Sequence, residues 1–332
     1  MRRSRILATG SYLPARRVTN SEVCGGLRLD AEAVYRRTGI RARRWAGAEE
    51  ASSQLAEQAA RAACAAAGIH PGSVDALLVS TTSPDMVFPS TACHLQRVLG
   101  ATQAAAFDLA ASCSGFLYGL SMADRFIRSG QFRRCLVVAA EVKSRFLNPG
   151  DEQTAILFGD GAGAAVVEGT TDSVVDPESG WIMGIRLYAD GSRHDLIEIP
   201  AGGSRHPASV QSVRERLHTV RMKGGALYRI AVRRLAEAVT DLLKEFGVGL
   251  HDVGQVIFHQ ANGRLLAAVC DRLGVPREKL FTSVEDLGNT SSASLPIALD
   301  RAVRGGCVHR GDLVLLGAFG GGLTWATGLV RW

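Results

Sequence analysis

The sequence has no long hydrophobic run, no C-x-x-C pair and few aromatic residues. In its 332 residues no apolar stretch reaches the roughly 18 residues that a membrane-spanning helix needs, so we expect no membrane protein. The basic start of the chain resembles the first part of a signal peptide, but Gly10 and Ser11 interrupt the apolar stretch behind it, so we expect no leader. The seven cysteines are an odd number without zinc-ribbon spacing, which argues against a disulfide framework and a metal site. We therefore expect a globular cytoplasmic protein with free thiols.

Lysine is also scarce, and most of the positive charge comes from arginine. The formal net charge is +6, and the basic residues are spread along the chain. Such a modest excess gives weak support for nucleic acid binding and fits an acidic protein or a phosphate-bearing partner at least as well. We expect neither a nucleic acid nor a membrane as partner.

The chain contains an internal repeat. Each copy begins with a helix, a glycine and an apolar strand, at 52–80 and at 226–259, and continues with a short helix that ends in Leu-Gly. Each copy closes with a second apolar strand, at 135–140 and at 313–318. Near-continuous apolar strands favour sheets that helices cover on both faces.

This repeat predicts a layered α/β fold that is built twice, with parallel crossovers and with halves at 1–170 and 171–332. The alternative is a chance similarity between two ordinary α/β stretches, but the order and spacing of the elements match. Residues 176–221, rich in Gly, Ser and Arg, are expected to form an insertion or cap at the start of the second half.

Three polar residues fall at strand ends, where α/β proteins place their chemistry. Cys113 lies in a turn of small residues between a strand and a helix, where a helix N-terminus can lower the pKa of a thiol. His259 ends the strand 256–258, and Asn289 lies in the turn of the second copy that corresponds to the Cys113 turn. We therefore expect Cys113 and Asn289 to face one cleft.

Each of the three has an ordinary structural explanation. The cysteine can be a packing residue, the histidine a loop residue and the asparagine a helix N-cap. Cysteine, histidine and asparagine at matching ends of a duplicated fold are nevertheless a recurrent nucleophilic set.

Two glycine-rich stretches need separate interpretations. Residues 159–164 superficially resemble a dinucleotide-binding loop, but the final glycine is missing and a strand follows, so we predict a strand connection. Residues 320–322 follow the last strand of the second copy and are candidates for backbone N–H donors to an oxyanion.

Seven ordered motifs add a family resemblance that covers almost the whole chain. They lead from Arg-Thr-Gly-Ile at 37–40 and Phe-Pro-Ser at 88–90 through the Cys113 turn to Phe-Gly-Asp-Gly-Ala-Gly at 158–163, His-Gln-Ala-Asn at 259–262, Gly-Asn-Thr-Ser at 288–291 and Ala-Phe-Gly-Gly-Gly at 318–322. With these motifs the sequence resembles the β-ketoacyl-acyl-carrier-protein synthase III family of thiolase-fold condensing enzymes. The resemblance implies a thiolase-like αβαβα layered fold and a homodimer.

The resemblance also implies roles for individual residues. Cys113 would be acylated by a thioester, and the N–H groups of Cys113 and Gly321 would hold the tetrahedral oxyanion. His259 and Asn289 would donate hydrogen bonds to a malonyl-type extender as it loses CO2, because two neutral donors stabilise an enolate without protonating it. The substrate-binding residues would be Arg37, Met86, Phe88 and Phe319.

Two positions depart from the family pattern. Ala33 stands where family members that use coenzyme A have a tryptophan against the adenine, and Glu152 stands near the position of the matching arginine. We therefore expect the phosphopantetheine arm of an acyl carrier protein as donor, with coenzyme A disfavoured and no tightly bound cofactor. The residues expected to contact the acidic carrier protein are Arg41, Arg43, Arg44 and Arg264, for which ordinary solvated arginines are the alternative.

Three functions remain open at this point. The first is condensation of a Cys113-bound acyl group with malonyl carrier protein. The second is an acyltransferase that moves a polyketide-derived acyl group through Cys113 to another carrier protein or a hydroxyl without decarboxylation. The third is a non-catalytic partner subunit, which the presence of Cys113 disfavours. The acyl group and the choice between fatty-acid and polyketide synthesis stay open.

Overall fold

Two β-sheets form the framework of the structure, a computed structural model that describes residues 3–170 and 180–332. Within these residues, one sheet has the strand order β1-β7-β6-β4-β5 and the other the order β11-β12-β13-β8. The strands are β1 (Arg3–Tyr12), β4 (Ala76–Ser80), β5 (Ala105–Leu109), β6 (Arg134–Glu141), β7 (Gly161–Thr170), β8 (Trp181–Ala189), β11 (Gln255–Phe258), β12 (Leu313–Gly320) and β13 (Thr324–Arg331).

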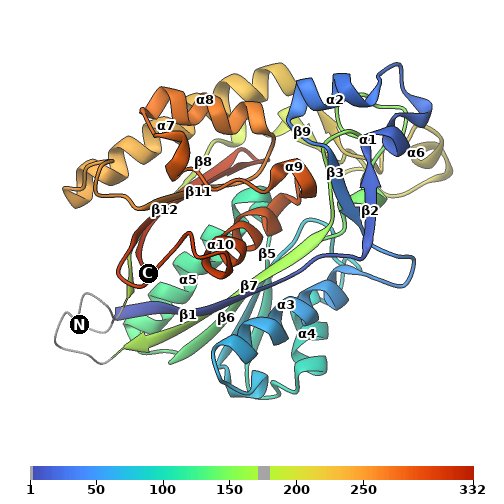
Figure 1. The fold of residues 1–332 in the computed structure, drawn as a ribbon. Coiled ribbons are helices and arrows are strands. Elements are labelled where there is room, and N and C mark those ends of the chain that lie inside the picture. Colours follow the sequence, from blue (N-terminus) through green and yellow to red (C-terminus); the bar gives the residue numbers. More distant parts are fainter. Residues whose placement is uncertain (1–2, 171–179) are drawn as a thin grey trace.

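Helices lie on both faces of each sheet, as Figure 1 shows. The outer face of the first sheet carries α3 (Ser52–Ala66) and α4 (Thr91–Leu99), and that of the second carries α7 (Gly224–Phe246) and α8 (Gly263–Leu273). Between the sheets lie α5 (Gly115–Ser129) and α10 (Ser294–Arg304), whose buried apolar side chains contact both. The predicted αβαβα layering is confirmed. Across the described residues, no helix is both long and apolar enough to cross a membrane.

The two sheets repeat one topology. The order β1-β7-β6-β4 in the first corresponds to β8-β13-β12-β11 in the second, with β4 parallel to β6 and β11 parallel to β12. The predicted duplication and its four apolar strands are therefore confirmed. The copies differ at β5, whose counterpart in the described part of the second half is a single bridge between Val256 and Leu280.

Matching capping residues define the short helix of each copy. The side chains of Ser90 and Asn262 accept backbone hydrogen bonds at the starts of α4 and α8. Both helices end at the predicted Leu-Gly pair, where Gly100 and Gly274 have φ angles of 67° and 70°. Only glycine adopts this left-handed conformation without a steric cost, which explains why both helices stop there.

The sequence halves are less separate in space than along the chain. Residues of the first half form β2 (Arg16–Thr19), α1 (Asn20–Val23), α2 (Ala31–Thr38) and β3 (Ala42–Trp45). Val34 and Ile40 from this segment share an apolar cluster with residues of α7, α8 and β11. The predicted boundary between 170 and 171 lies at the edge of the segment 171–179, outside the described residues, and stays a prediction.

The expected cap at 176–221 is only partly correct. Residues 176–179 lie outside the described residues, and Trp181–Ala189 is β8, which pairs with β13 as an integral strand of the second sheet. The remainder does lie outside the sheet, as β9 (Ile197–Glu198), α6 (Val210–Arg214) and β10 (Arg221–Met222). The sequence analysis missed β8 because glycine and arginine residues surround its alternating apolar residues.

Arg43 does not lie on the surface. Its side chain is fully buried, and it donates hydrogen bonds to Asn20 Oδ1 at 2.8 Å and to the Ile156 carbonyl at 2.6 Å. Burial lowers the pKa of Arg43 to about 10. The expectation that Arg43 meets a carrier protein is therefore wrong, because this guanidinium joins two segments inside the molecule.

We predict that Arg43→Ala lowers the free energy of unfolding by about 3 kcal/mol, because the substitution leaves a cavity and two buried acceptors without a donor. Urea unfolding measures the loss. Arg44→Ala is the matched control, because the half-buried Arg44 side chain donates to the Ala15 carbonyl as its one side-chain hydrogen bond among the described residues, and its loss should stay below about 1 kcal/mol. Equal losses in the two variants would contradict the structural role of Arg43.

Candidate active site

Cys113 lies between β5 and α5, in the short 3-10 helix Ser112–Ser114. The preceding residue, Ser112, has a left-handed φ of 49°, which bends the chain sharply into α5. The Cys113 side chain is only 7% exposed, and its sulfur lies 3.6 Å from Ser291 Oγ and 3.9 Å from Ser112 Oγ. The thiol is thus held at the junction of the two halves.

Burial raises the pKa of the Cys113 thiol above its ordinary value. Hydrogen bonds from Ser291 and Ser112 and the charge of Lys143 act in the opposite direction but are outweighed. The expected lowering of this pKa by a helix N-terminus is not confirmed, because loss of hydration dominates in so buried a position. Cys113 is therefore a neutral thiol in the free protein, and a base would have to take its proton before it could act as a nucleophile.

His259 follows β11 and is fixed by its backbone, whose N–H donates to the Gly317 carbonyl at 2.7 Å. Its side chain is buried, and burial lowers the pKa of His259 to about 4. Nδ1 is buried and has no hydrogen-bond partner within residues 3–170 and 180–332. At neutral pH the imidazole is uncharged, so it can accept a proton or donate its own N–H.

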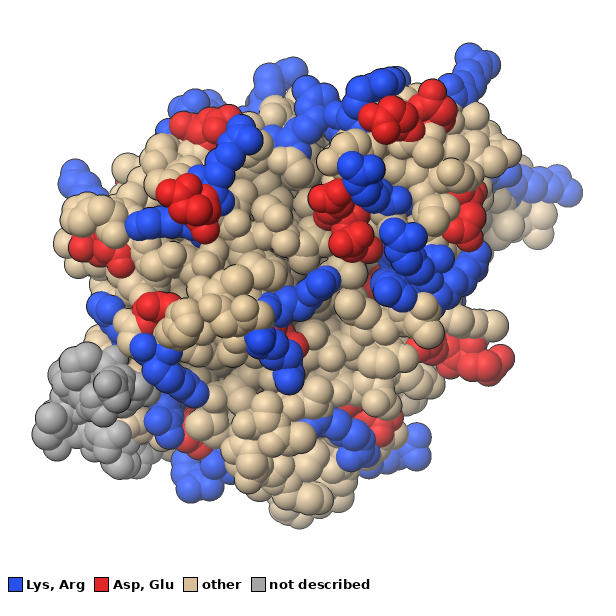
Figure 2. Space-filling model, in the orientation of Figure 1, with Lys and Arg blue, Asp and Glu red and all other residues tan. Residues whose placement is uncertain are grey.

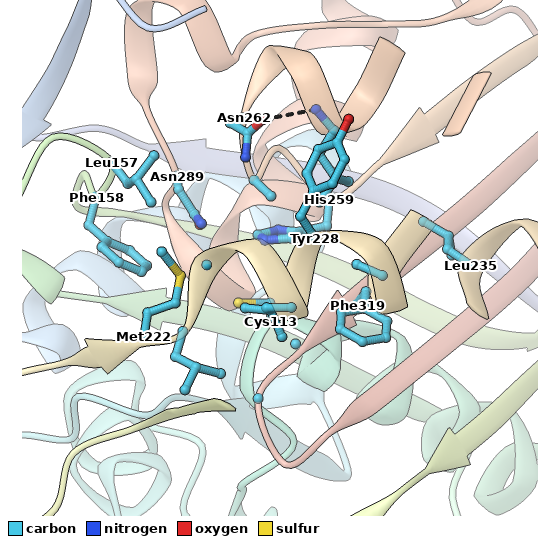
Figure 3. Close-up of a pocket in the computed structure, with 18 residues that line it drawn as sticks. Cys113, Leu157, Phe158, Met222, Tyr228, Leu235, His259, Asn262, Asn289 and Phe319 are labelled. Atoms are coloured by element: carbon cyan, nitrogen blue, oxygen red, sulfur yellow. Dashed lines mark hydrogen bonds between the residues drawn. The ribbon is translucent and has the colours of Figure 1, made fainter. Parts of the chain in front are cut away.

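Asn289 lies between α9 (Val284–Leu287) and the 3-10 helix Ser291–Ala293. Its N–H donates to the Leu157 carbonyl at 2.8 Å, and its Oδ1 accepts from the Ser291 N–H at 2.8 Å. This bond directs the carboxamide NH2 away from the turn and into the cavity (Figure 3). The asparagine therefore presents a neutral donor.

The two turns correspond as expected, with a shift in the matching residues. Ser291 has a φ of 52°, close to the 49° of Ser112, and each opens a three-residue 3-10 helix. Ser292 is therefore the positional counterpart of Cys113, while Asn289 precedes it by three residues in the same turn. The repeat thus predicted the correct turn, but it matched Asn289 to Cys113 where the structure matches Ser292.

One cavity of about 230 Å³ brings the three candidates together (Figure 3). Phe319, which the family resemblance places at the substrate, also borders it and stacks on Trp325 at 6.0 Å between ring centroids. The lining is otherwise mostly apolar and comes from α7, α8 and neighbouring loops: Leu157, Phe158, Ile197, Met222, Gly224, Leu227, Tyr228, Ala231, Leu235, Ala261, Asn262, Leu265, Gly320 and Gly321.

Gly320 allows the C-terminal end of β12 to pass directly beside Cys113. A Cβ atom on this residue would lie 2.6 Å from the Cys113 backbone nitrogen. Gly321 also borders the cavity, and a Cβ there would lie 3.3 Å from Ser112 Oγ. The close approach explains why the chain has glycine here and brings the Gly321 backbone next to the Cys113 turn.

A buried ion pair behind Cys113 was missed by the sequence analysis. Glu141 is fully buried and accepts hydrogen bonds from Ser83 at 2.5 Å, Ser292 at 2.9 Å and Ser291 at 3.1 Å, and its Oε2 lies 3.4 Å from Lys143 Nζ. Burial alone raises the pKa of Glu141, but Lys143 and these donors outweigh it and lower the pKa. A glutamate at the end of the apolar strand β6 and a lysine two residues later were the available signal.

The other predicted binding residues do not line this cavity. Met86 and Phe88 are 43% and 87% exposed, and Arg37 is exposed on α2. Their roles stay predictions.

The three remaining arginines lie at or near the surface. Arg41 forms a 2.5 Å ion pair with Glu285, Arg44 is half-buried, and exposed Arg264 adjoins the cavity residue Leu265 on α8. On the face shown in Figure 2, basic side chains alternate with acidic ones and do not form a single patch. Carrier-protein contact therefore stays a prediction for these three residues.

Comparison with known proteins agrees with this geometry. Residues 107–191 match the family described as 3-oxoacyl-[acyl-carrier-protein (ACP)] synthase III, and residues 243–332 match its C-terminal part. A β-ketoacyl-[acyl-carrier-protein] synthase III from Caldanaerobacter subterraneus subsp. tengcongensis is 43% identical over 328 residues, which cover 98% of this chain and 97% of the relative.

Solved structures show the same similarity. The 3-oxoacyl-[acyl-carrier-protein] synthase III of Aquifex aeolicus VF5 has a TM-score of 0.90 and 40% identity, covering 99% of this chain and 100% of that one. The priming β-ketosynthase of the R1128 polyketide pathway has a TM-score of 0.89 and 36% identity, covering 98% and 95%.

The fold is thus the thiolase fold, with Cys113 at the junction of the duplicated halves. The chain belongs to the β-ketoacyl-acyl-carrier-protein synthase III family, and it is an enzyme of the transferase class.

We predict that the buried neutral His259 makes stability fall with acid. Its folded pKa of about 4 lies below the ordinary 6.5, so the unfolded chain binds the extra proton first. The contribution is complete above pH 6.5 and is lost as the pH falls toward 4. Between pH 7.5 and pH 5 the wild type should lose about 2 kcal/mol more unfolding free energy than His259→Gln.

Urea unfolding at the two pH values measures this difference. His251→Gln is the control, because the His251 side chain is 86% exposed, and it should lose as much stability as the wild type. The same acid loss in His259→Gln as in the wild type would show that His259 does not carry the effect.

Proposed function

We propose that this enzyme is a β-ketoacyl-acyl-carrier-protein synthase III that acylates Cys113 from a carrier-protein thioester and condenses the acyl group with malonyl carrier protein. The single observation that carries the proposal is the shared cavity in which the Cys113 thiol, the neutral His259 imidazole and the Asn289 amide meet. The names of the relatives support the same reaction class.

The first half-reaction transfers the acyl group to sulfur. His259 takes the Cys113 proton as the sulfur attacks the thioester carbonyl, and the backbone N–H groups of Cys113 and Gly321 stabilise the oxyanion. The C–S bond to the carrier then breaks, and the proton passes from His259 to the departing thiolate. His259 returns to the uncharged form that its buried position favours.

The second half-reaction forms the carbon–carbon bond. Malonyl carrier protein loses CO2, and the electron pair of the broken C–C bond forms an enolate whose oxygen accepts hydrogen bonds from His259 and Asn289. The enolate carbon attacks the acyl carbonyl on Cys113, and collapse of the tetrahedral adduct expels the Cys113 thiolate, which takes up a proton from solvent. A neutral pair suits this step because a charged imidazolium would protonate the enolate.

The donor in this proposal is a phosphopantetheine thioester and not acyl-coenzyme A, with no tightly bound cofactor. Ala33 offers no ring to stack on adenine, and Glu152 accepts a hydrogen bond from the Arg28 N–H at 2.8 Å. A carboxylate held at that position disfavours a phosphorylated nucleotide. Arg264, Arg41 and Arg44 would contact the acidic carrier protein.

A homodimer and a cytoplasmic location complete the proposal. Val87 and Phe88 are 92% and 87% exposed on adjacent positions, an apolar surface that a second copy of the chain would cover and that would bring Phe88 toward the partner's acyl site. All seven cysteines are free, which suits the reducing cytoplasm.

We predict that intact-mass analysis detects an acyl adduct from acyl carrier protein and none on Cys113→Ala. Malonyl carrier protein should then release CO2, and Asn289→Ala should lower that rate about a hundredfold while still forming the adduct, because Asn289 acts on the enolate and not on the thiol. Asn148→Ala, which changes an asparagine that does not border the cavity, is the control and should match the wild type.

Each other outcome decides against part of the proposal. Acyl exchange without CO2 would establish the simple acyltransferase. Adduct formation from acyl-coenzyme A as fast as from the carrier would overturn the donor assignment, and the absence of any Cys113-dependent adduct would overturn the proposed function.

We predict that the protein sediments as a dimer and that Phe88→Ser weakens dimerisation by at least roughly tenfold, because buried aromatic side chains dominate the energetics of interfaces. Analytical ultracentrifugation over a dilution series measures the change. Val213→Ser alters a 58% exposed apolar side chain elsewhere on the molecule and should leave the association unchanged. A monomeric wild type would contradict the proposed dimer.

A further inference from the structure

A second cavity also borders Cys113. It has a volume of about 200 Å³ and shares Cys113, Phe158, Ile197 and Gly321 with the first. His259 and Asn289 border only the first cavity. An extender that uses these two donors must therefore lie in the first cavity, which leaves the second for the acyl chain attached to Cys113. This step rests on the proposed function.

The second cavity contains a buried ammonium group among apolar side chains. Lys143 is 5% exposed and borders the cavity together with Thr82, Ser291, Ile199 and Val220. Its Nζ donates to Thr82 Oγ1 at 2.5 Å and lies 3.4 Å from Glu141 Oε2. An ammonium has three N–H donors, and these are its two polar partners in the part of the chain that the structure describes.

A plain alkyl chain is a poor partner for the Lys143 ammonium at the wall of this cavity. It would displace water from the remaining N–H of Lys143 without replacing the hydrogen bond, and an unpaired buried donor is costly. An acyl group with an oxygen atom at this depth restores the bond. Hydrogen bonds to charged groups are stronger than neutral ones, so the preference should be large.

The charges of the site decide what kind of oxygen it accepts. The Lys143 charge is already balanced by the buried carboxylate of Glu141, and the exposed residue Glu198 also borders the cavity. A carboxylate on the substrate would meet repulsion from Glu141. A neutral hydroxyl or carbonyl oxygen meets none.

From these contacts we propose that Lys143 makes the enzyme selective for a short acyl group that carries a neutral oxygen, a hydroxyl or a carbonyl, beyond the thioester. Lys143 is in this sense a specificity-determining residue for acylation of Cys113. Lys143 selects the acyl group and does not change the thioester chemistry at Cys113.

The test compares rates of adduct formation on Cys113 from butyryl, 3-hydroxybutyryl and succinyl carrier protein, followed by intact mass. The wild type should prefer 3-hydroxybutyryl over butyryl by about tenfold and react slowest with succinyl. Lys143→Met keeps the length of the side chain, removes the donor and should remove or reverse the preference. Lys244→Met, an exposed substitution on α7, should keep it.

Ratios within one protein preparation are independent of the folded fraction, and Glu141→Gln/Lys143→Met provides a second variant without an unpaired buried carboxylate. It should show the same loss of preference. Equal wild-type rates with butyryl and 3-hydroxybutyryl, fastest reaction with succinyl, or an unchanged preference in both Lys143 variants would overturn the inference. Adducts without a preference would leave the proposed function intact, whereas no adduct from any of the three donors would overturn both.

Discussion

The buried carboxylate of Glu141 is the constraint on which the arrangement around Cys113 depends. It receives hydrogen bonds from Ser83 in the first half and from Ser291 and Ser292 in the second, so one side chain joins both copies of the fold directly behind the sulfur. A buried charge without partners would be strongly destabilising, which ties these serines and Lys143 to fixed positions. The position of Ser291 beside the thiol follows from this requirement.

Burial also determines the charge state of the site. The same loss of hydration raises the pKa of Cys113 and lowers that of His259, so thiol and imidazole are both neutral before substrate binds. The site therefore differs from one that stores a thiolate beside an imidazolium. Its apolar lining suits a reaction in which charge appears only on the reacting carbonyl and enolate oxygens.

Much of the fold was predictable because short sequence patterns specify its strands, helix ends and turns. Apolar runs identified the repeated strands, Leu-Gly pairs identified the helix ends, and the turn positions of Cys113 and Asn289 identified the site. The burial of Arg43 and Lys143 was not predicted, because charged side chains are usually solvated. Only the packing of segments that are distant in the sequence shows that these two are buried. The pKa of Cys113 was misjudged for the same reason, since the depth of a turn is a property of the assembled layers.

The left-handed φ angles of Ser112 and Ser291 recur in both copies of the fold, although only one of the two turns carries a cysteine. The second turn carries no cysteine at the matching position, only Ser292, yet it has nearly the same conformation. The chain thus contains its own comparison, because one turn carries a cysteine and the other does not. The left-handed bend before Cys113 therefore belongs to the repeated fold and does not depend on the thiol that follows it.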